Sequence, residues 1–288
     1  MNFALKSNLK IDAHQHFWQP LRGDYDWMPQ DNLILNRPYT PSDLKPSLEK
    51  YGIDGTVLVQ AAPTAQETEY MLGLADATSS IKGVVGWINF ENPNDLTILE
   101  RFAAHPKFLG VRPMIQDIPD INWMLREDVQ WAFQAIIGLD ITFDALGFPM
   151  HLPNFLKLVM RYPQMRIVYD HCMKPQVYDQ RSGKDAFSQW ANDISRLADE
   201  TRGCCKFSGL VTEAGDGWTI DDLRPFAEHV LSAFGASRVM WGSDWPVCRL
   251  QAGYGDWHDI AQDLTQGLSK ADHAQIFGAT ATRFYRLS

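Results

Sequence analysis

Eight short apolar runs, each followed by a segment with helical patterning, limit most strongly what this chain can fold into. Most of the runs are almost continuously hydrophobic, which is typical of parallel strands that are covered on both faces. Alternation of this kind predicts a parallel sheet with right-handed crossovers. The expected strands are Lys10–His16, Gly55–Gln60, Val84–Phe90, Leu109–Ile115, Leu139–Asp144, Met165–His171, Cys205–Leu210 and Val239–Trp245.

The intervals between these runs carry helix signals. Ser, Asp or Asn stands at many of the starts, and Gly or Pro at many of the stops. The expected helices are Pro41–Tyr51, Gln66–Ser79, a segment from Asn94 to His105, Asp128–Ile137, Pro153–Tyr162, Ser182–Thr201, Thr219–Phe234, Asp256–Gly267 and Lys270–Tyr285.

Eight strand–helix units in a chain of 288 residues favour a closed barrel over an open sheet, because a (β/α)8 barrel needs about 250 residues. No Gly-x-Gly-x-x-Gly follows the first expected strand, which counts against a dinucleotide-binding fold. We therefore predict an α/β protein with a single (β/α)8 TIM barrel over residues 1–288. Residues 19–41 form the main insertion and carry Tyr25 and Trp27, so we expect a lid or pocket wall there.

The composition excludes several classes of partner. The net charge of −9 and the lack of a basic run argue against nucleic-acid binding. No apolar stretch is long enough to cross a membrane, and Met1–Lys10 lacks the apolar core of a signal peptide. The four cysteines fit no disulfide or zinc-knuckle spacing. We expect a cytoplasmic protein, monomeric or homo-oligomeric, that acts on a small molecule.

Two histidines stand two residues apart in the first expected strand, in Asp12-Ala13-His14-Gln15-His16. Side chains alternate along a strand, so His14 and His16 point to the same side. Two imidazoles on one face of a buried strand are costly unless water, a ligand or a metal satisfies them. A hydrogen-bonded pair without a chemical role is the alternative for an isolated motif of this kind.

Other polar residues stand at the expected strand ends, where barrel enzymes place their active sites. Convergence of three histidines and one aspartate from strands 1, 6 and 8 predicts a functional site. The alternative is that these polar side chains lie at strand ends only because they face water there. The polar residues of these strand ends are His14, His16, Gln60, Arg112, Asp170, His171, Lys206, Ser208 and Asp244.

Four motifs carry a family resemblance along essentially the whole chain. They resemble the amidohydrolase superfamily, and within it the sugar-lactone hydrolases related to L-fuconolactonase, L-rhamnonolactonase and 2-pyrone-4,6-dicarboxylate lactonase. His14-Gln15-His16-Phe17-Trp18 followed by Tyr25-Asp26-Trp27-Met28 is most similar to the L-fuconolactonase side. The motifs are Asp12-Ala13-His14-Gln15-His16, Asp170-His171-Cys172-Met173-Lys174-Pro175, Lys206-Phe207-Ser208-Gly209-Leu210 and Trp241-Gly242-Ser243-Asp244-Trp245-Pro246.

The resemblance implies a barrel of the metal-dependent hydrolase type, but this chain departs from the two-metal pattern. That pattern has a carboxylated Lys or a Glu at the end of strand 4 and a His at the end of strand 5. Here strand 4 offers Arg112, and strand 5 ends in Phe143-Asp144-Ala145. We therefore expect a hydrolase that needs no metal. The alternative is one zinc on His14, His16 and Asp244, with or without His171.

The resemblance further implies a hydrolase that opens the ester ring of L-fuconolactone or a related aldonolactone. We expect Asp244 to be the general base for water, and His171, His14 and His16 to polarise the carbonyl as charged donors or as ligands of zinc. Arg112, Gln60, Trp27, Tyr25 and His151 are the expected substrate-binding residues.

Other roles and functions stay open at this point. Asp12, Asp170 and Ser208 are candidates for orienting the site, and the sequence does not decide the roles of Lys174 and Lys206. A zinc-dependent decarboxylase, or another amidohydrolase-type enzyme acting on a small carboxylate, is the alternative function. A sugar-acid binding barrel without activity is a third hypothesis.

Overall fold

The computed structural model describes residues 9–288 and confirms the predicted (β/α)8 barrel. The expectation that Met1–Lys10 contains no signal peptide falls mostly on residues 1–8, which lie outside the described residues. Eight parallel strands pair in chain order in one sheet. The strands are β1 (Ile11–Gln15), β2 (Gly55–Val59), β3 (Ile81–Gly86), β4 (Phe108–Val111), β5 (Thr142–Ala145), β6 (Arg166–Tyr169), β7 (Cys204–Phe207) and β8 (Val239–Trp241).

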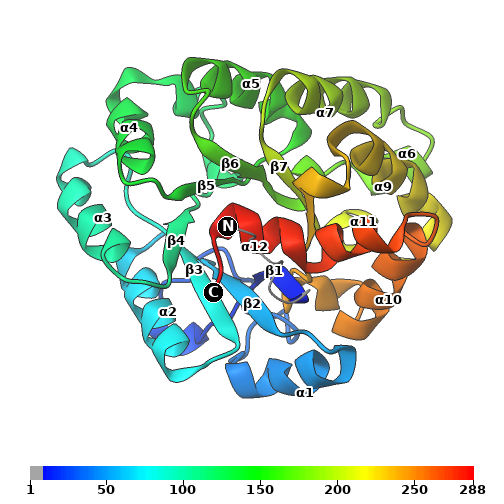
Figure 1. The fold of residues 1–288 in the computed structure, drawn as a ribbon, viewed down its shortest axis with the longest axis horizontal. Helices are drawn as coiled ribbons and strands as arrows, with labels where there is room; N and C mark the ends of the chain where they lie inside the picture. The colour runs from blue at the N-terminus through cyan, green and yellow to red at the C-terminus, as the bar shows by residue number, and fades with distance from the viewer. Residues whose placement is uncertain (1–8) are drawn as a thin grey trace, which may run out of the picture.

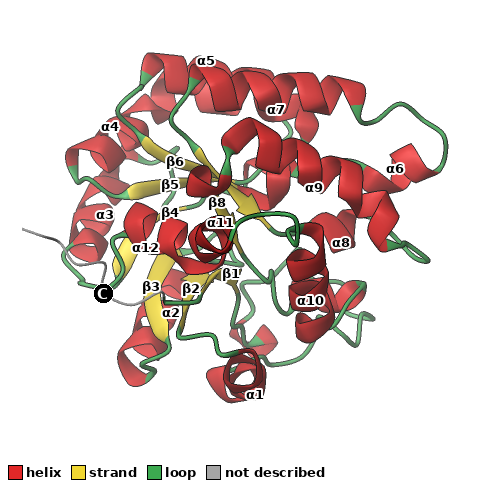
Figure 2. Cartoon of the chain, turned by 45° about the vertical axis from the view of Figure 1, so that its right-hand side comes forward, coloured by secondary structure: helices red, strands yellow, loops and turns green. Residues whose placement is uncertain are grey.

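Helices surround the strands as an outer ring (Figure 1; Figure 2). Apolar side chains fill the layer between strands and helices, which is why the strands read as hydrophobic runs on both faces. The helices are α1 (Pro41–Tyr51), α2 (Ala65–Ala77), α3 (Leu96–Ala103), α4 (Gln130–Gly138), α5 (Leu152–Arg161), α6 (Val177–Arg181), α7 (Ser188–Glu200), α8 (Leu210–Glu213), α9 (Ile220–Phe234), α10 (Tyr254–Leu264), α11 (Lys270–Ala274) and α12 (Thr280–Tyr285).

The barrel closes between β1 and the segment that follows β8. The Trp245 carbonyl accepts a hydrogen bond from the His16 amide at 2.7 Å, and the His14 carbonyl accepts one from the Asp244 amide at 2.8 Å. The Asp12 carboxylate accepts a further bond from the Ser243 amide at 2.8 Å. The closure therefore binds the two histidine-bearing positions directly to the segment that carries Asp244.

The opposite end of the barrel is covered by the C-terminal segment. In Figure 1, α11 and α12 cross in front of the strands. Ala281 and Tyr285 of α12 pack with Ile11 of β1 and Val57 of β2 in a separate apolar cluster. The Tyr285 hydroxyl donates to the Asp144 carboxylate of β5 at 2.6 Å. This end is therefore plugged, and ligands must approach from the carboxyl ends of the strands.

Most of the predicted strands run past the ends of the observed ones. The third strand is predicted as Val84–Phe90, but it ends at Gly86, because the Trp87 amide donates to the hydroxyl of Thr68 in α2 instead of to a neighbouring strand. The helix predicted at 182–201 begins only at Ser188, as α7. The short α6 was not predicted; it ends at Arg181, ahead of Gly183, which has a positive φ of 85°. The last helix contains a wider π turn over Gln275–Ala279.

The long segment between β1 and α1 corresponds to the predicted insertion at 19–41. It is tied down where Trp18 and Tyr39 form an antiparallel bridge. The Trp18 indole donates to the carbonyls of Leu35 and Arg37 at 3.1 and 2.9 Å. The segment is therefore anchored at both ends, and its role as a lid stays a prediction, as does the single domain over 1–288.

Gly278 in the π turn offers a test of the plugged end. A Cβ atom at this position would overlap the backbone carbonyl oxygen of Leu9, which cannot move as a side chain can. We expect Gly278→Ala to lower the free energy of unfolding by about 1–3 kcal/mol, measured by urea denaturation. Gly73→Ala is the control, because Gly73 is exposed in α2 with nothing within 4 Å of the new Cβ. That variant should gain about 0.5–1 kcal/mol, and equal effects of the two substitutions would contradict the packing shown here.

Candidate active site

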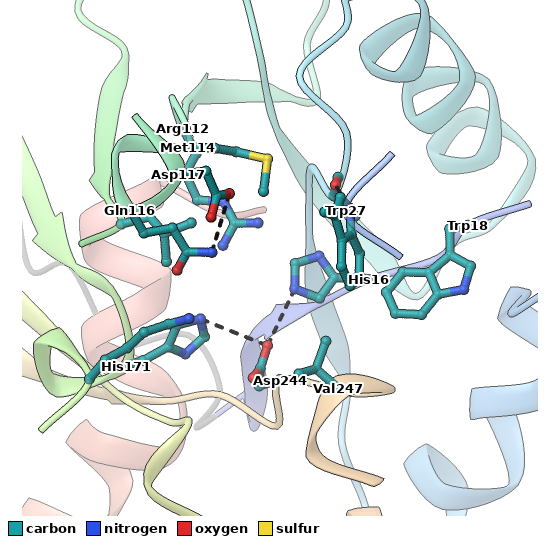
Figure 3. A pocket seen from close by; sticks show the side chains of 13 residues that line it. His16, Trp18, Trp27, Arg112, Met114, Gln116, Asp117, His171, Asp244 and Val247 are labelled. Atoms are coloured by element: carbon teal, nitrogen blue, oxygen red, sulfur yellow. Dashed lines mark hydrogen bonds and ion pairs between the residues drawn. The ribbon is translucent and has the colours of Figure 1, made fainter. Parts of the chain in front are cut away.

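Four titratable side chains meet at the carboxyl ends of β1, β6 and β8. Figure 3 shows three of them, His16, His171 and Asp244. Nε2 of His14 lies 3.2 Å from Nε2 of His16. Oδ1 of Asp244 lies 3.3 Å from Nε2 of His16, 3.7 Å from Nε2 of His14 and 3.8 Å from Nε2 of His171. The constellation expected from strands 1, 6 and 8 is therefore assembled around a single carboxylate oxygen.

The backbone that carries two of these side chains adopts unusual conformations. Four consecutive residues from His171 to Lys174 have φ between 49° and 59°, and Asp244 has φ 55°. Left-handed backbone costs about 1–2 kcal/mol for each residue with a Cβ atom. Surrounding contacts therefore have to hold it, and such strain is typical of functional sites. One holding contact is the hydrogen bond at 2.9 Å that the Trp190 indole donates to the Cys172 carbonyl.

Ring nitrogens that do not face Asp244 have their own partners. Nδ1 of His16 donates to the Val59 carbonyl at 2.7 Å. Nδ1 of His171 lies 2.9 Å from the Ser208 hydroxyl, a contact consistent with the orienting role expected for Ser208, which stays a prediction. A neutral His16 consequently carries its proton on Nδ1 and turns a lone pair on Nε2 towards the site.

Arg112 at the end of β4 supplies a buried positive charge. Its guanidinium donates to both the carbonyl and the side-chain oxygen of Gln60, the latter at 3.0 Å, and lies 3.4 Å from Asp170 Oδ2. Gln60 in turn donates to the Arg112 carbonyl at 2.8 Å. Gln60, expected to bind substrate, therefore fixes the position of Arg112, because each of the two residues donates a hydrogen bond to the other.

Lys206 of β7 is fully buried beside the cluster. Its ammonium lies 2.6 Å from Asp144 Oδ2, 3.0 Å from Asp170 Oδ1 and 3.0 Å from His14 Nδ1. The sequence left its role open. The available signal was a lysine within an otherwise apolar strand.

Burial determines the charge states of the imidazoles. Desolvation lowers the pKa of His14 and of His16, and it lowers the pKa of His171 to about 4. These rings are therefore neutral at neutral pH, which disfavours the first of the two expected roles, that of charged donors, and does not bear on the second, that of zinc ligands. Burial alone would raise the pKa of Asp244, but the facing rings of His171, His16 and His14 outweigh it and hold that pKa below its ordinary value.

A cavity of about 280 Å³ opens above the cluster (Figure 3). His16, His171, Asp244, Arg112 and Trp27 line it as expected. His14 lies fully buried beneath them. Residues that the sequence did not single out as substrate-binding complete the wall, several of them in the loop after β4: Trp18, Ala61, Met114, Gln116, Asp117, Leu146, Lys174 and Val247.

Three expected substrate-binding residues, Gln60, Tyr25 and His151, are not among those that line the cavity. Gln60 contacts Arg112 instead. Tyr25 is buried with its hydroxyl towards the Glu67 carboxyl. His151 precedes α5, and its Nδ1 accepts a hydrogen bond from the Phe148 amide at 3.0 Å. In this structure neither of these two side chains lines the cavity.

The positions of three donors fit a single zinc ion. Nε2 of His14, Nε2 of His16 and Oδ1 of Asp244 are separated by 3.2, 3.3 and 3.7 Å. Zinc ligands at about 2.0–2.1 Å in a tetrahedron are about 3.4 Å apart. His16 also has the second partner that metal-bound histidines usually have, because its Nδ1 donates to the Val59 carbonyl.

Comparison with known proteins assigns the family. The amidohydrolase family model matches residues 11–287, and this chain belongs to that family. It is 40% identical over 282 residues to an L-fucono-1,5-lactonase of Burkholderia ambifaria, with 96% of each chain covered. It is 33% identical over 288 residues to an L-fucono-1,5-lactonase of Burkholderia multivorans, covering 97% of this chain and 96% of that one.

A solved structure agrees with this assignment. A Burkholderia multivorans amidohydrolase with bound zinc superimposes with a TM-score of 0.91 at 32% identity, covering 97% of this chain and all of that one. Among residues 9–288, no helix combines the length and apolar character needed to cross a membrane.

Glu67 of α2 offers a test of the cavity wall. Its buried carboxyl accepts hydrogen bonds from the Ala61 and Ala62 amides at 2.9 and 2.6 Å, and the Ala61 carbonyl accepts one from the Trp27 indole at 2.6 Å. Burial raises the pKa of Glu67 from 4.5 to about 7. Between these pH values the folded state retains a proton that the unfolded state has lost, so stability falls as the pH rises.

We expect Glu67→Gln to remove this dependence, because the amide cannot ionise. The free energy of unfolding of the variant, relative to wild type, should increase by about 3 kcal/mol between pH 4.5 and pH 7. Urea denaturation of both proteins across this range measures it. A difference that does not change with pH would show that Glu67 is ionised throughout.

Proposed function

We propose that this protein hydrolyses the ester ring of a sugar-derived lactone, L-fuconolactone or a related aldonolactone, to the free sugar acid. The observation that carries the proposal is a buried, ionised Asp244 facing Arg112 across a small cavity with neutral imidazoles around it. The similarity to two L-fucono-1,5-lactonases over nearly the full length of the chain supports the substrate class.

Asp244 is the general base of the proposed reaction. It takes a proton from water as the water oxygen attacks the lactone carbonyl carbon. When the tetrahedral intermediate collapses, the bond from carbon to ring oxygen breaks, and the ring oxygen takes the proton back from Asp244.

Arg112 stabilises the negative charge that develops on the carbonyl oxygen. Its guanidinium is buried and fixed by Gln60, so the positive charge is oriented before substrate arrives. A planar fork of donors also suits an oxygen-rich substrate. Trp27 contributes a half-buried ring to the cavity wall, with its indole nitrogen already bonded to the Ala61 carbonyl, and we assign it to contact with the sugar ring.

A zinc ion held by His14, His16 and Asp244 would polarise the carbonyl and acidify a water molecule. We propose that the reaction does not require it. Arg112 supplies the positive charge and Asp244 the base from this chain's own residues.

A panel of aldono-1,4- and aldono-1,5-lactones, with acid release followed by a pH indicator, tests the function. We expect turnover of L-fuconolactone or a close stereoisomer, and a loss of about 10³-fold or more in kcat for Asp244→Asn. Asp263→Asn is the matched control, because Asp263 is exposed on α10. Near-normal turnover by the Asp244 variant would remove Asp244 from the role of base.

Metal dependence is tested by purifying the protein with a chelator and measuring zinc content and activity on the same sample. We expect full lactonase activity without bound zinc. Activity that is lost with the metal and restored by added zinc would contradict the metal-independent reaction.

A further inference from the structure

Lys206 is placed where a positive charge has to be compensated. Its side chain is fully buried, and removing an unpaired ammonium from water costs several kcal/mol. Asp144 and Asp170 compensate the charge at 2.6 and 3.0 Å. The ammonium also contacts a group that is not a carboxylate, Nδ1 of His14, at 3.0 Å.

The contact with Lys206 determines which nitrogen of a neutral His14 bears the proton. A lysine ammonium has three donors and no acceptor. Nδ1 of His14 must therefore offer its lone pair, and the ring proton lies on Nε2. The opposite tautomer would need Asp170 Oδ2 to accept from Nδ1 at 3.7 Å and Arg112 to donate to Nε2 at 3.4 Å. Both distances are longer than the contact with Lys206, so the Nε2–H form is favoured.

The proton on Nε2 of His14 has a hydrogen-bond acceptor in the neighbouring ring of His16. Nε2 of His16 lies 3.2 Å away and carries a lone pair, because Nδ1 of His16 donates to the Val59 carbonyl. If the proton of His14 were on Nδ1, no N–H would lie among Nε2 of His14, Nε2 of His16 and Oδ1 of Asp244, which are 3.2–3.7 Å apart. With the proton on Nε2, one N–H serves all three atoms. The contacts of His16 thus favour independently the same tautomer as the contact with Lys206.

We propose that Lys206 is a positioning residue that keeps the proton of His14 on Nε2, directed at His16 and Asp244 beneath the cavity. It acts through His14 and does not touch the cavity itself. Its effect on turnover rests on the proposed lactonase function, whereas its effect on the tautomer does not. A metal ion on Nε2 of His14 and a proton there exclude each other, so the lysine also favours the metal-free form of the site.

Nitrogen-15 NMR of protein labelled at histidine tests the tautomer directly, because two-bond couplings distinguish Nδ1–H from Nε2–H rings. The missing signal of a His14→Gln variant assigns His14. We expect the Nε2–H form in the wild-type protein. We expect Lys206→Met to shift His14 to the Nδ1–H form, with Asp170 as its acceptor.

Kinetics provides the second readout. We expect kcat of Lys206→Met to fall about 10- to 100-fold, the range typical of residues that orient a functional imidazole, with KM changed less than about 3-fold. Lys206→Gln retains an N–H donor without the charge and should lose less. Tyr285→Phe is the control, because it removes the other donor to Asp144 Oδ2 and should leave both the tautomer and kcat unchanged.

The outcomes separate the two proposals. An Nδ1–H ring in the wild-type protein, or an unchanged tautomer in Lys206→Met, overturns the role of Lys206. The expected tautomers in a protein that hydrolyses no lactone would support that role and contradict the proposed function. If Lys206→Met does not fold, the wild-type spectrum and Lys206→Gln decide the question.

Discussion

The ion cluster of Lys206, Asp144, Asp170 and Arg112 in the centre of the barrel is the interaction on which the rest of the site depends. Each member comes from or directly follows a different strand, and all four are buried. Two cations and two anions balance in charge, which makes burial tolerable where a single ion would not be. Removing any one of them would leave an unpaired buried charge, so the cluster fixes the relative positions of β4, β5, β6 and β7. Nδ1 of His14 contacts Lys206 of this cluster, and Nε2 of the same ring lies 3.2 Å from His16 and 3.7 Å from Asp244.

Rigidity of this kind explains how the loops can hold costly backbone conformations. His171 and Asp244 both have left-handed backbone, although neither is a glycine. Their side chains face each other across 3.8 Å. A hydrogen bond between the Ser208 hydroxyl and His171, and one that the Asp244 amide donates to the His14 carbonyl, tie these turns to neighbouring strands. The stability of the barrel thus offsets the free-energy cost of these turns, which direct the side chains of His171 and Asp244 at one point.

The sequence predicted the barrel and the four convergent residues, because strand periodicity and strand-end position are local properties. It could not predict that the apolar run through Trp87 leaves the sheet, since a hydroxyl from α2 captures the backbone there. It assigned Tyr25 and His151 to substrate, whereas neither side chain lines the cavity and the His151 ring accepts a hydrogen bond from the Phe148 amide. The cavity-lining residues of the loop after β4, such as Met114 and Asp117, follow no periodicity. The charge state of the histidines depended on burial, which a pattern of residues does not measure.

The seam that closes the barrel has a consequence for how the protein folds. The hydrogen bond from the Ser243 amide to Asp12 joins residues 231 positions apart in the chain. Contacts of such long range form late and slowly, because a large loop must be closed before they contribute. The same seam brings Asp244 to His14 and His16. During refolding, the meeting of Asp244 with His14 and His16 therefore cannot precede closure of the barrel, a step that joins the two ends of the sheet.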